Sequence, residues 1–155
     1  MEKRTSYRSR MVRIDFADPA MVIPAITDLM IDNWSETGFD FEFRPSVDMY
    51  RHAVESGAMF VLVAAVGSEI VGYCSMFVHP HMHNPSVVMA ANDALFVKKE
   101  YRGIISGRLI RAAEAESKKR GATRVLWHTR SGTALAAMLE RRGYTPADVV
   151  VMKEI

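Results

Sequence analysis

The strongest constraint on the fold is a pair of apolar runs, residues 59–66 and 70–78, separated only by Gly67, Ser68 and Glu69. Connections this short join antiparallel strands, and glycine suits such turns because it adopts positive φ at little steric cost. The two runs are therefore predicted to form a β-hairpin. A further apolar run over residues 87–97 predicts a third strand after it.

The N-terminal part of the chain predicts one strand and two helices. Residues 8–16 alternate loosely in apolar character and end at Asp18-Pro19, an N-cap residue followed by a first-turn proline. Helical spacing follows, and Pro24 is expected either to lie near the start of that helix or to bend it. A serine N-cap then predicts a second helix over residues 46–55.

The C-terminal part predicts alternating helices and strands. A loop and helix are expected over residues 101–120, a strand over 123–129, a helix over 131–142 opened by Ser131, and a last strand over 144–152. The resulting order is βααβββαβαβ, an α/β architecture with a mixed sheet covered by helices on both faces. No repeat or linker interrupts the pattern, so residues 1–155 are predicted to be one domain.

Composition excludes several classes of protein. The formal charge of +2, from 20 basic and 18 acidic residues, is too small for the basic field of a nucleic-acid-binding protein. The longest apolar run, residues 58–66, is far shorter than the roughly 20 residues of a membrane span. Because no apolar segment follows the charged residues 2–4, we do not expect a secretion signal. The single cysteine, Cys74, cannot form an internal disulfide, so we expect a cytoplasmic protein. From the charge and the apolar run lengths together, we expect neither a nucleic-acid nor a membrane partner.

The segment over residues 95–110 carries the clearest chemical signal, because it predicts a strand, a short loop and a helix N-terminus. Unpaired backbone N–H groups at such a terminus attract phosphate, Gly103 and Gly107 allow close approach, and Arg102 and Arg108 add positive charge. The glycine spacing does not match a Walker phosphate loop. The alternative is a glycine-containing turn with solvated arginines.

This segment and the element order resemble the GNAT superfamily of N-acetyltransferases over nearly the whole chain. The coenzyme A loop of that family reads Arg or Gln, two residues, Gly, one residue, then Gly or Ala. Residues 102–107 follow it, except that Ile105 stands where the family has its middle glycine. Residues 134–144 are also similar to the last helix of the family and the glycine-aromatic pair after it. The resemblance implies a mostly antiparallel central sheet.

The resemblance further implies direct transfer of an acetyl group from acetyl-CoA to an amine, without a covalent enzyme intermediate. The backbone of residues 95–97 would pair with the pantetheine arm, and the backbone amides of residues 102–107 would hold the pyrophosphate. An oxyanion donor is expected from the backbone N–H of Val97 or Phe96. The residues expected to bind the cofactor are Leu95, Phe96, Val97, Arg102, Gly103, Ile104, Ile105, Ser106, Gly107 and Arg108.

An acid and a base complete the expected chemistry, since an alkyl ammonium must lose a proton before it attacks. Asp93 is the first candidate base, because it is expected to share strand parity with Leu95 and Val97; the alternative is a solvated carboxylate. The family often uses a tyrosine as the acid, at a position that is Leu139 here. Tyr144 and Tyr101 are possible substitutes, although Tyr144 also suits a role as a packed aromatic anchor.

Two further groups of residues are candidates for the acceptor side. His79, His81 and His83 alternate in sequence and could supply a base, a substrate contact or metal ligands, or be solvated residues of an irregular loop; no metal is expected. Aromatic residues between the first two helices, where the family places its acceptor pocket, could line a substrate site or pack in the core: Trp34, Phe39, Phe41 and Phe43.

The leading hypothesis is therefore an acetyl-CoA-dependent N-acetyltransferase that acts on a primary amine of a small molecule or a protein. Because Ile105 and Leu139 replace two usual family residues, the alternative is a non-catalytic GNAT-like module that binds an acyl-CoA or a protein partner. Either form is compatible with a homodimer.

Overall fold

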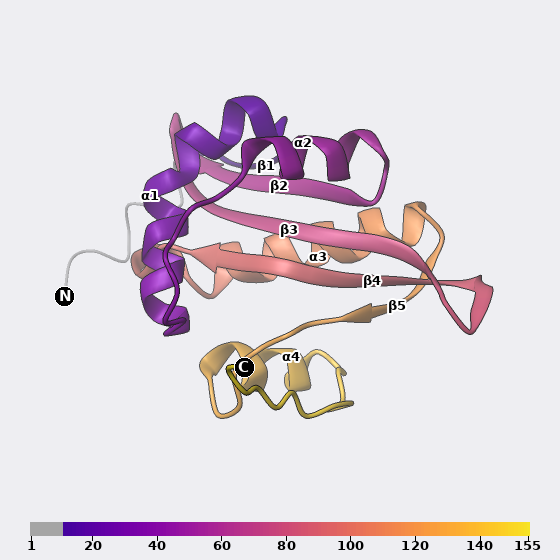
Figure 1. Cartoon of the computed structure of the whole chain (residues 1–155). Coiled ribbons are helices and arrows are strands. Elements are labelled where there is room, and N and C mark those ends of the chain that lie inside the picture. Colours follow the sequence, from indigo (N-terminus) through magenta and orange to yellow (C-terminus); the bar gives the residue numbers. More distant parts are fainter. Residues whose placement is uncertain (1–10) are drawn as a thin grey trace.

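A computed structural model of the chain describes residues 11–155, with side chains described for residues 11–18 and 23–155. Five strands form one sheet in the order β1-β2-β3-β4-β5, in which the first four are antiparallel and β5 is parallel to β4 (Figure 1). The strands are β1 (Val12–Phe16), β2 (Met59–Val66), β3 (Glu69–His81), β4 (Asn84–Val97) and β5 (Ala122–Leu126). The predicted mixed α/β sheet is confirmed. Residues 8–10 of the first predicted strand lie outside the described residues.

Helices cover both faces of this sheet, as predicted. On one face, α1 (Pro19–Thr37) and α2 (Val47–Glu55) pack against alternate residues of β2, such as Val61 and Val63. On the other face, α3 (Ile104–Lys119) packs against the intervening residues, such as Leu62 and Ala64. The fourth helix, α4 (Ala134–Arg141), lies beyond the end of β5 (Figure 1). No helix among the described residues is both long and apolar enough to cross a membrane.

Alternation in β2 explains why the sheet is buried on both sides. All eight residues of this strand are buried, and successive side chains point to opposite faces. Each face therefore gains its own apolar core, and each fully buried Val or Leu contributes roughly 1.5–3 kcal/mol. Gly67, with φ of 62°, forms the tight turn that reverses the chain into β3, so the predicted hairpin is confirmed.

The predicted N-terminal ends are confirmed for α1 and α2, and the predicted N-cap of α4 is wrong. The first helix begins at Pro19, and Ser46 caps α2 by accepting a hydrogen bond from the Met49 N–H at 3.3 Å. The first helix continues through Pro24 rather than starting near it, so it lacks one backbone hydrogen bond at that point. The last helix is capped by Thr133 rather than Ser131, because the Thr133 hydroxyl accepts from the Ala136 N–H at 3.2 Å.

Two other sequence predictions are corrected by the structure. Residues 79–83 are not an irregular loop: β3 and β4 extend to residues 81 and 84, with a register shift at Pro80. Residues 144–152 form no strand, and Val149, Val150 and Val151 are each more than 80% exposed. A β-branched run becomes a strand only where a neighbouring strand offers hydrogen bonds, and no strand of residues 11–143 pairs with this run.

Candidate active site

A β-bulge in β4 sets the direction of the Asp93 side chain. Across the β3–β4 ladder, Ser75 stands opposite Ala94 and Met76 opposite Asn92, which leaves Asp93 as the additional residue. A bulge of this kind breaks the alternation of side chains and re-aims the extra residue. The sequence predicted that Asp93 lies on the same face of the strand as residues 95 and 97. This prediction is wrong, because Asp93 faces α2 together with Ala94.

Two hydroxyl groups fix the Asp93 carboxylate. The Tyr50 hydroxyl donates to Oδ2 of Asp93 at 3.0 Å, and the Ser75 hydroxyl donates to the same oxygen at 2.8 Å. Burial and the nearby Asp93 charge raise the pKa of Tyr50, so its phenol keeps the proton that it donates. Within the described side chains, Oδ1 accepts no hydrogen bond. One carboxylate oxygen is thus held and the other remains available.

Asp93 lies on a pocket of about 340 Å³ between α1, α2 and the sheet. Trp34 is the centre of its aromatic wall, with ring centroids at 4.9 Å from Phe39, 4.8 Å from Phe41 and 5.9 Å from Phe43. The structure therefore brings three predicted acceptor residues, Trp34, Phe39 and Phe41, into one pocket with the predicted base. The lining residues are Met30, Asn33, Trp34, Thr37, Phe39, Phe41, Glu42, Phe43, Arg44, Pro45, Tyr50, Tyr73, Asp93 and Ala94.

Polar residues that were not predicted from the sequence also line this pocket, among them Asn33 and Tyr73. The Asn33 amide donates to the Tyr73 hydroxyl at 3.1 Å, so the phenol hydrogen itself is available for another acceptor. Burial raises the pKa of Tyr73 to about 12. Tyr73 and Ser75 are two positions apart in β3, so their side chains lie on the same face of the sheet. This spacing was the sequence feature from which their shared location could have been predicted. Nothing in the sequence pointed to Tyr50 or Asn33.

The sheet opens beside this pocket, where β4 and β5 separate. Their ladder ends at the pair Ala91 and Leu126, and the chain after β5 runs away toward α4 (Figure 1). The buried amide of Asn92 bridges the start of the gap, since it accepts from the His128 N–H at 2.6 Å and donates to the His128 carbonyl at 3.3 Å. Within the described part of the chain, the last residues of β4 therefore pair with a strand on their β3 side alone.

The direction of the backbone groups on the open side follows from one hydrogen bond. The Lys98 N–H donates to the Val71 carbonyl at 2.9 Å, toward β3. Because hydrogen-bonded positions alternate along an antiparallel strand, the N–H and C=O groups of Val97 and Leu95 point the other way, into the opening. Val97 is therefore better placed than Phe96 to present an N–H there.

The N-terminus of α3 lies next along the chain, after a single 3-10 turn, η2 (Lys99–Tyr101). Gly103 caps it with φ of 90° and ψ of −89°, a conformation that disfavours other residues, and no side chain hydrogen-bonds to the helix start. The N–H groups of the first turn, at Ile104, Ile105 and Ser106, have no partner within the helix. The Ile105 side chain is buried in the core below α3, so its branched chain does not cover this terminus.

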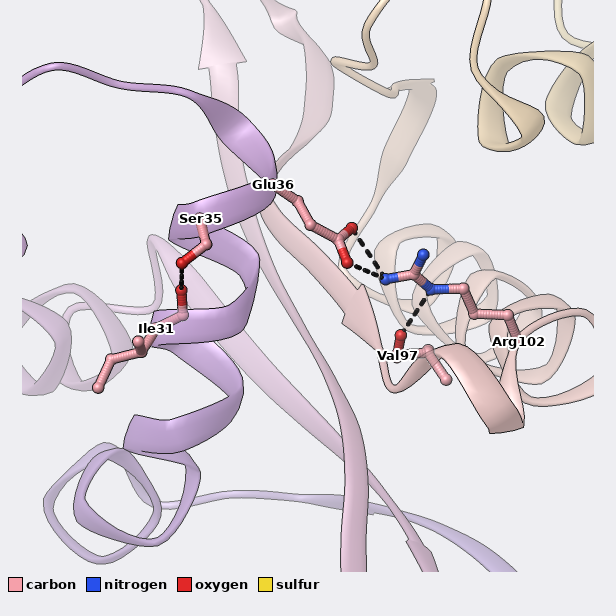
Figure 2. Close-up of polar contacts among 5 residues, drawn as sticks. All are labelled: Ile31, Ser35, Glu36, Val97 and Arg102. Carbon is pink, nitrogen blue, oxygen red and sulfur yellow. Dashed lines mark hydrogen bonds and ion pairs between the residues drawn. The ribbon is translucent and has the colours of Figure 1, made fainter.

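The two arginines predicted near the phosphate site are both engaged elsewhere. Arg102 Nε donates to the Val97 carbonyl at 2.8 Å, and Nη2 lies 2.8 and 2.9 Å from the two carboxylate oxygens of Glu36 in α1 (Figure 2). Its guanidinium also lies 5.4 Å from the centre of the Phe96 ring. Arg108 Nη2 donates to the Val12 carbonyl of β1 at 3.1 Å.

A third arginine, Arg111, was missed by the sequence analysis. It lies one turn after Gly107, and its guanidinium is the group nearest to the space that a Cβ at Gly107 would occupy, 4.0 Å away. Among the described residues Arg111 has no acidic partner. Because residues four positions apart lie on the same face of a helix, the spacing of Gly107 and Arg111 could have predicted that Arg111 lies near Gly107.

Three predicted catalytic or binding residues are not brought to this pocket. His79 and His81 lie on the β3–β4 hairpin, where His79 Nδ1 is 3.1 Å from the Pro80 carbonyl. The Tyr144 hydroxyl donates to Glu114 of α3 at 2.7 Å and does not line the pocket. Within residues 11–18 and 23–155, no three potential ligands of the His, Cys, Asp or Glu type cluster as a metal site would require.

A sheet that opens between two parallel strands, a glycine-capped helix at that opening and a carboxylate pocket beside it together define an acetyltransferase fold of the GNAT type. Residues 23–144 match the family described as "Acetyltransferase (GNAT) family", so the chain belongs to that family. No curated protein sequence gives a match.

Solved structures with the same fold span nearly the whole chain. An aminoglycoside acetyltransferase from an uncultured soil metagenomic sample has a TM-score of 0.73 at 19% identity, covering 94% of this chain and 98% of that one. Ribosomal-protein-alanine N-acetyltransferase from Brucella melitensis biovar Abortus 2308 has a TM-score of 0.69 at 16% identity, covering 94% and 99%. An acetyltransferase from Trypanosoma brucei has a TM-score of 0.71 at 12% identity, covering 94% and 100%.

Proposed function

We propose that this protein transfers the acetyl group of acetyl-CoA to a primary amine, with Asp93 as the group that receives a proton from the amine. The observation that carries the proposal is the bulge that turns Asp93 into a pocket next to the open edge of β4. The acceptor nitrogen and the thioester would meet where pocket and opening adjoin. Membership of an acetyltransferase family supports the reaction type.

The cofactor would bind along the open edge of β4 and at the start of α3. The outward backbone groups of Leu95 and Val97 suit an added extended chain such as pantetheine. The first turn of α3 has a glycine N-cap without a side-chain hydrogen bond and suits the pyrophosphate, because its free N–H groups and the helix dipole both favour an anion. The Arg111 guanidinium over Gly107 supplies a positive charge that no described acidic side chain neutralises.

The chemistry follows from these positions. An alkyl ammonium loses one proton to expose its lone pair and a second as the C–N bond forms, while the C–S bond breaks and the thiolate takes up a proton. Oδ1 of Asp93 is free to accept a proton from the amine, directly or through water. The Val97 N–H points into the opening, where it can stabilise the oxyanion, a contribution typically worth about 10² to 10³ in rate.

Thermal unfolding with and without acetyl-CoA tests the cofactor first, with adenosine as a control that lacks the pantetheine arm. At about 100 times Kd the ligand adds roughly 2.7 kcal/mol, a shift on the order of 5–10 °C for a domain of this size. Thiol release from acetyl-CoA across a set of amines then tests turnover. A shift without turnover on any amine would leave the non-catalytic binding module as the correct description.

A further inference from the structure

From the walls and charges of the Asp93 pocket, we infer that the acceptor is a small monoamine with an aromatic body, such as an arylalkylamine. This inference rests on the proposed function and adds the chemical class of the substrate. It depends on three properties of the pocket, namely its exposed aromatic wall, its single net charge and its size.

The aromatic wall is more exposed than packing alone explains. Phe41 is 60% exposed and Phe39 is 44% exposed, yet their rings lie 5.2 Å apart and both contact Trp34. Single exposed apolar residues are common, but a contiguous exposed group is typical of binding sites. These rings stand on the pocket that contains Asp93, so a ligand with an aromatic body can cover them while its amine meets the carboxylate.

The charges on the pocket favour a ligand with one positive group. Asp93, Glu42 and Arg44 are its charged lining residues, so one net negative charge remains. Glu42 and Arg44 carry opposite charges, so together they add no net charge to the lining. A second ammonium on the ligand would find no further net negative charge on this lining, because Arg44 balances Glu42. A monoamine leaves the remaining negative charge, at Asp93, for its single ammonium.

The volume and the available hydrogen bonds point in the same direction. About 340 Å³ is at the low end of the 300–1,000 Å³ typical of ligand pockets. The four rings of the wall offer a single donor, the indole N–H of Trp34. A highly hydroxylated acceptor would therefore lose hydrogen bonds to water along this wall without replacement, whereas a hydrocarbon ring would lose none.

A panel of amines at saturating acetyl-CoA tests the inference. We expect kcat/KM for 2-phenylethylamine to exceed that for butylamine by at least about tenfold, because only the former has a ring to bury. Butylamine should in turn exceed 1,4-diaminobutane, which adds a second ammonium. Equal values for 2-phenylethylamine and butylamine, or a preference for the diamine or for an aminoglycoside, would overturn the inference while leaving acetyl transfer established.

A pair of matched variants locates the effect. Phe41→Ala should lower kcat/KM for 2-phenylethylamine by about tenfold and that for butylamine by less than twofold. Phe16→Ala is the control, because Phe16 is 58% exposed and lies outside this pocket; it should change neither value. An equal loss for both amines in Phe41→Ala would show that the ring supports the fold rather than the ligand.

Binding measured by tryptophan fluorescence separates this inference from the proposed function. With coenzyme A present, 2-phenylethylamine should change the emission of the wild type with a lower Kd than butylamine, and Trp34→Phe should abolish the change. If no amine is acetylated but this binding preference holds, the proposed reaction is wrong and the ligand class stands. If neither turnover nor preferential binding occurs, both are wrong.

Discussion

The Tyr50 hydroxyl in α2 donates to Oδ2 of Asp93 in β4 at 3.0 Å, which joins residues 43 positions apart. Ser75 of β3 donates to the same oxygen, so side chains of two elements, α2 and β3, hold one carboxylate oxygen, while the other accepts no hydrogen bond from the described side chains. An orientation held from two sides costs no rearrangement when an amine arrives. The held carboxylate is therefore the first feature of the proposed site to test by mutation.

Asp93→Asn should lower kcat by about 10² to 10⁴, the usual contribution of a positioned base, with little change in the thermal shift by acetyl-CoA. The amide can still accept hydrogen bonds from Tyr50 and Ser75 but receives no proton from the amine. Steady-state kinetics with the best amine of the panel measures the effect. Tyr50→Phe is the comparison, and should cost less because Ser75 still holds Oδ2.

An Asp93→Asn variant with near wild-type kcat would show that the proton leaves by another route. Raised KM for the amine with unchanged kcat would instead assign Asp93 to substrate binding alone.

The position of Asp93 shows where sequence patterns stop. The strand over residues 87–97 and an acidic residue before its end could be predicted from alternation and from the family resemblance. The face of the strand on which Asp93 lies could not, because one bulged residue reverses the parity and leaves no mark in the sequence. The candidate base was therefore predicted on the wrong face of the strand, and its hydrogen-bond partners Tyr50 and Ser75 were not predicted.

Gly107→Glu and Gly107→Ala form a pair that separates cofactor binding from stability. Apart from its chain neighbours and the nearby backbone of α3 itself, no described atom comes closer than 4.0 Å to a Cβ at this position, and its φ is not positive, so both variants should fold. Gly107→Ala should raise the free energy of unfolding by about 0.5–1 kcal/mol, because alanine has a higher helix propensity than glycine. Gly107→Glu places a carboxylate at the proposed pyrophosphate site and should raise the acetyl-CoA Kd by at least about tenfold. Calorimetric titration measures both values of Kd, and equal values would remove the site from this helix terminus.

Glu36→Gln tests whether the ion pair between Glu36 and Arg102 restrains the cofactor edge. Arg102 also holds the Val97 carbonyl, one of the groups proposed to pair with pantetheine. Weakening its anchor should lower the acetyl-CoA Kd about two- to fivefold, the range expected for a partly exposed ion pair. Glu116→Gln is the control, because it removes the pair with Arg120 on α3 at a comparable 2.7 Å. A higher Kd in Glu36→Gln would mean that Glu36 holds Arg102 in its binding position.

Long-range pairs such as Glu36 and Arg102 also mark what the sequence could not predict. The loop glycines and the basic residues of this segment were recognised from their spacing, but spacing does not report which acid pairs with Arg102 from 66 positions away. The same limit explains the last predicted strand over residues 144–152. Its apolar β-branched residues satisfied the local pattern, yet strand formation depends on a partner edge that only the tertiary structure supplies.

Tyr144→Phe should reduce stability and leave catalysis nearly unchanged. The Tyr144 hydroxyl donates to Glu114 at 2.7 Å, and neither residue lines the Asp93 pocket. Loss of this hydrogen bond should cost about 1 kcal/mol, or roughly 2–4 °C in Tm. Denaturant unfolding and kcat measured on the same preparation provide the test. A fall in kcat of more than tenfold, with Tm unchanged, would restore Tyr144 as the acid that protonates the leaving thiolate.

Alkaline pH should destabilise the fold partly through Tyr73. Burial raises the pKa of its phenol from about 10 to about 12, so the folded chain holds this proton more tightly than the unfolded chain does. The corresponding stability is complete below pH 10 and is lost as the pH rises from 10 through 12, by roughly 2–3 kcal/mol at most. Urea unfolding at pH 8, 10 and 11.5 should therefore show a steeper decline for the wild type than for Tyr73→Phe, which has no phenol to ionise. If the free energy of unfolding fell equally with pH in both proteins, the Tyr73 hydroxyl would titrate as a solvated phenol and not as a buried one.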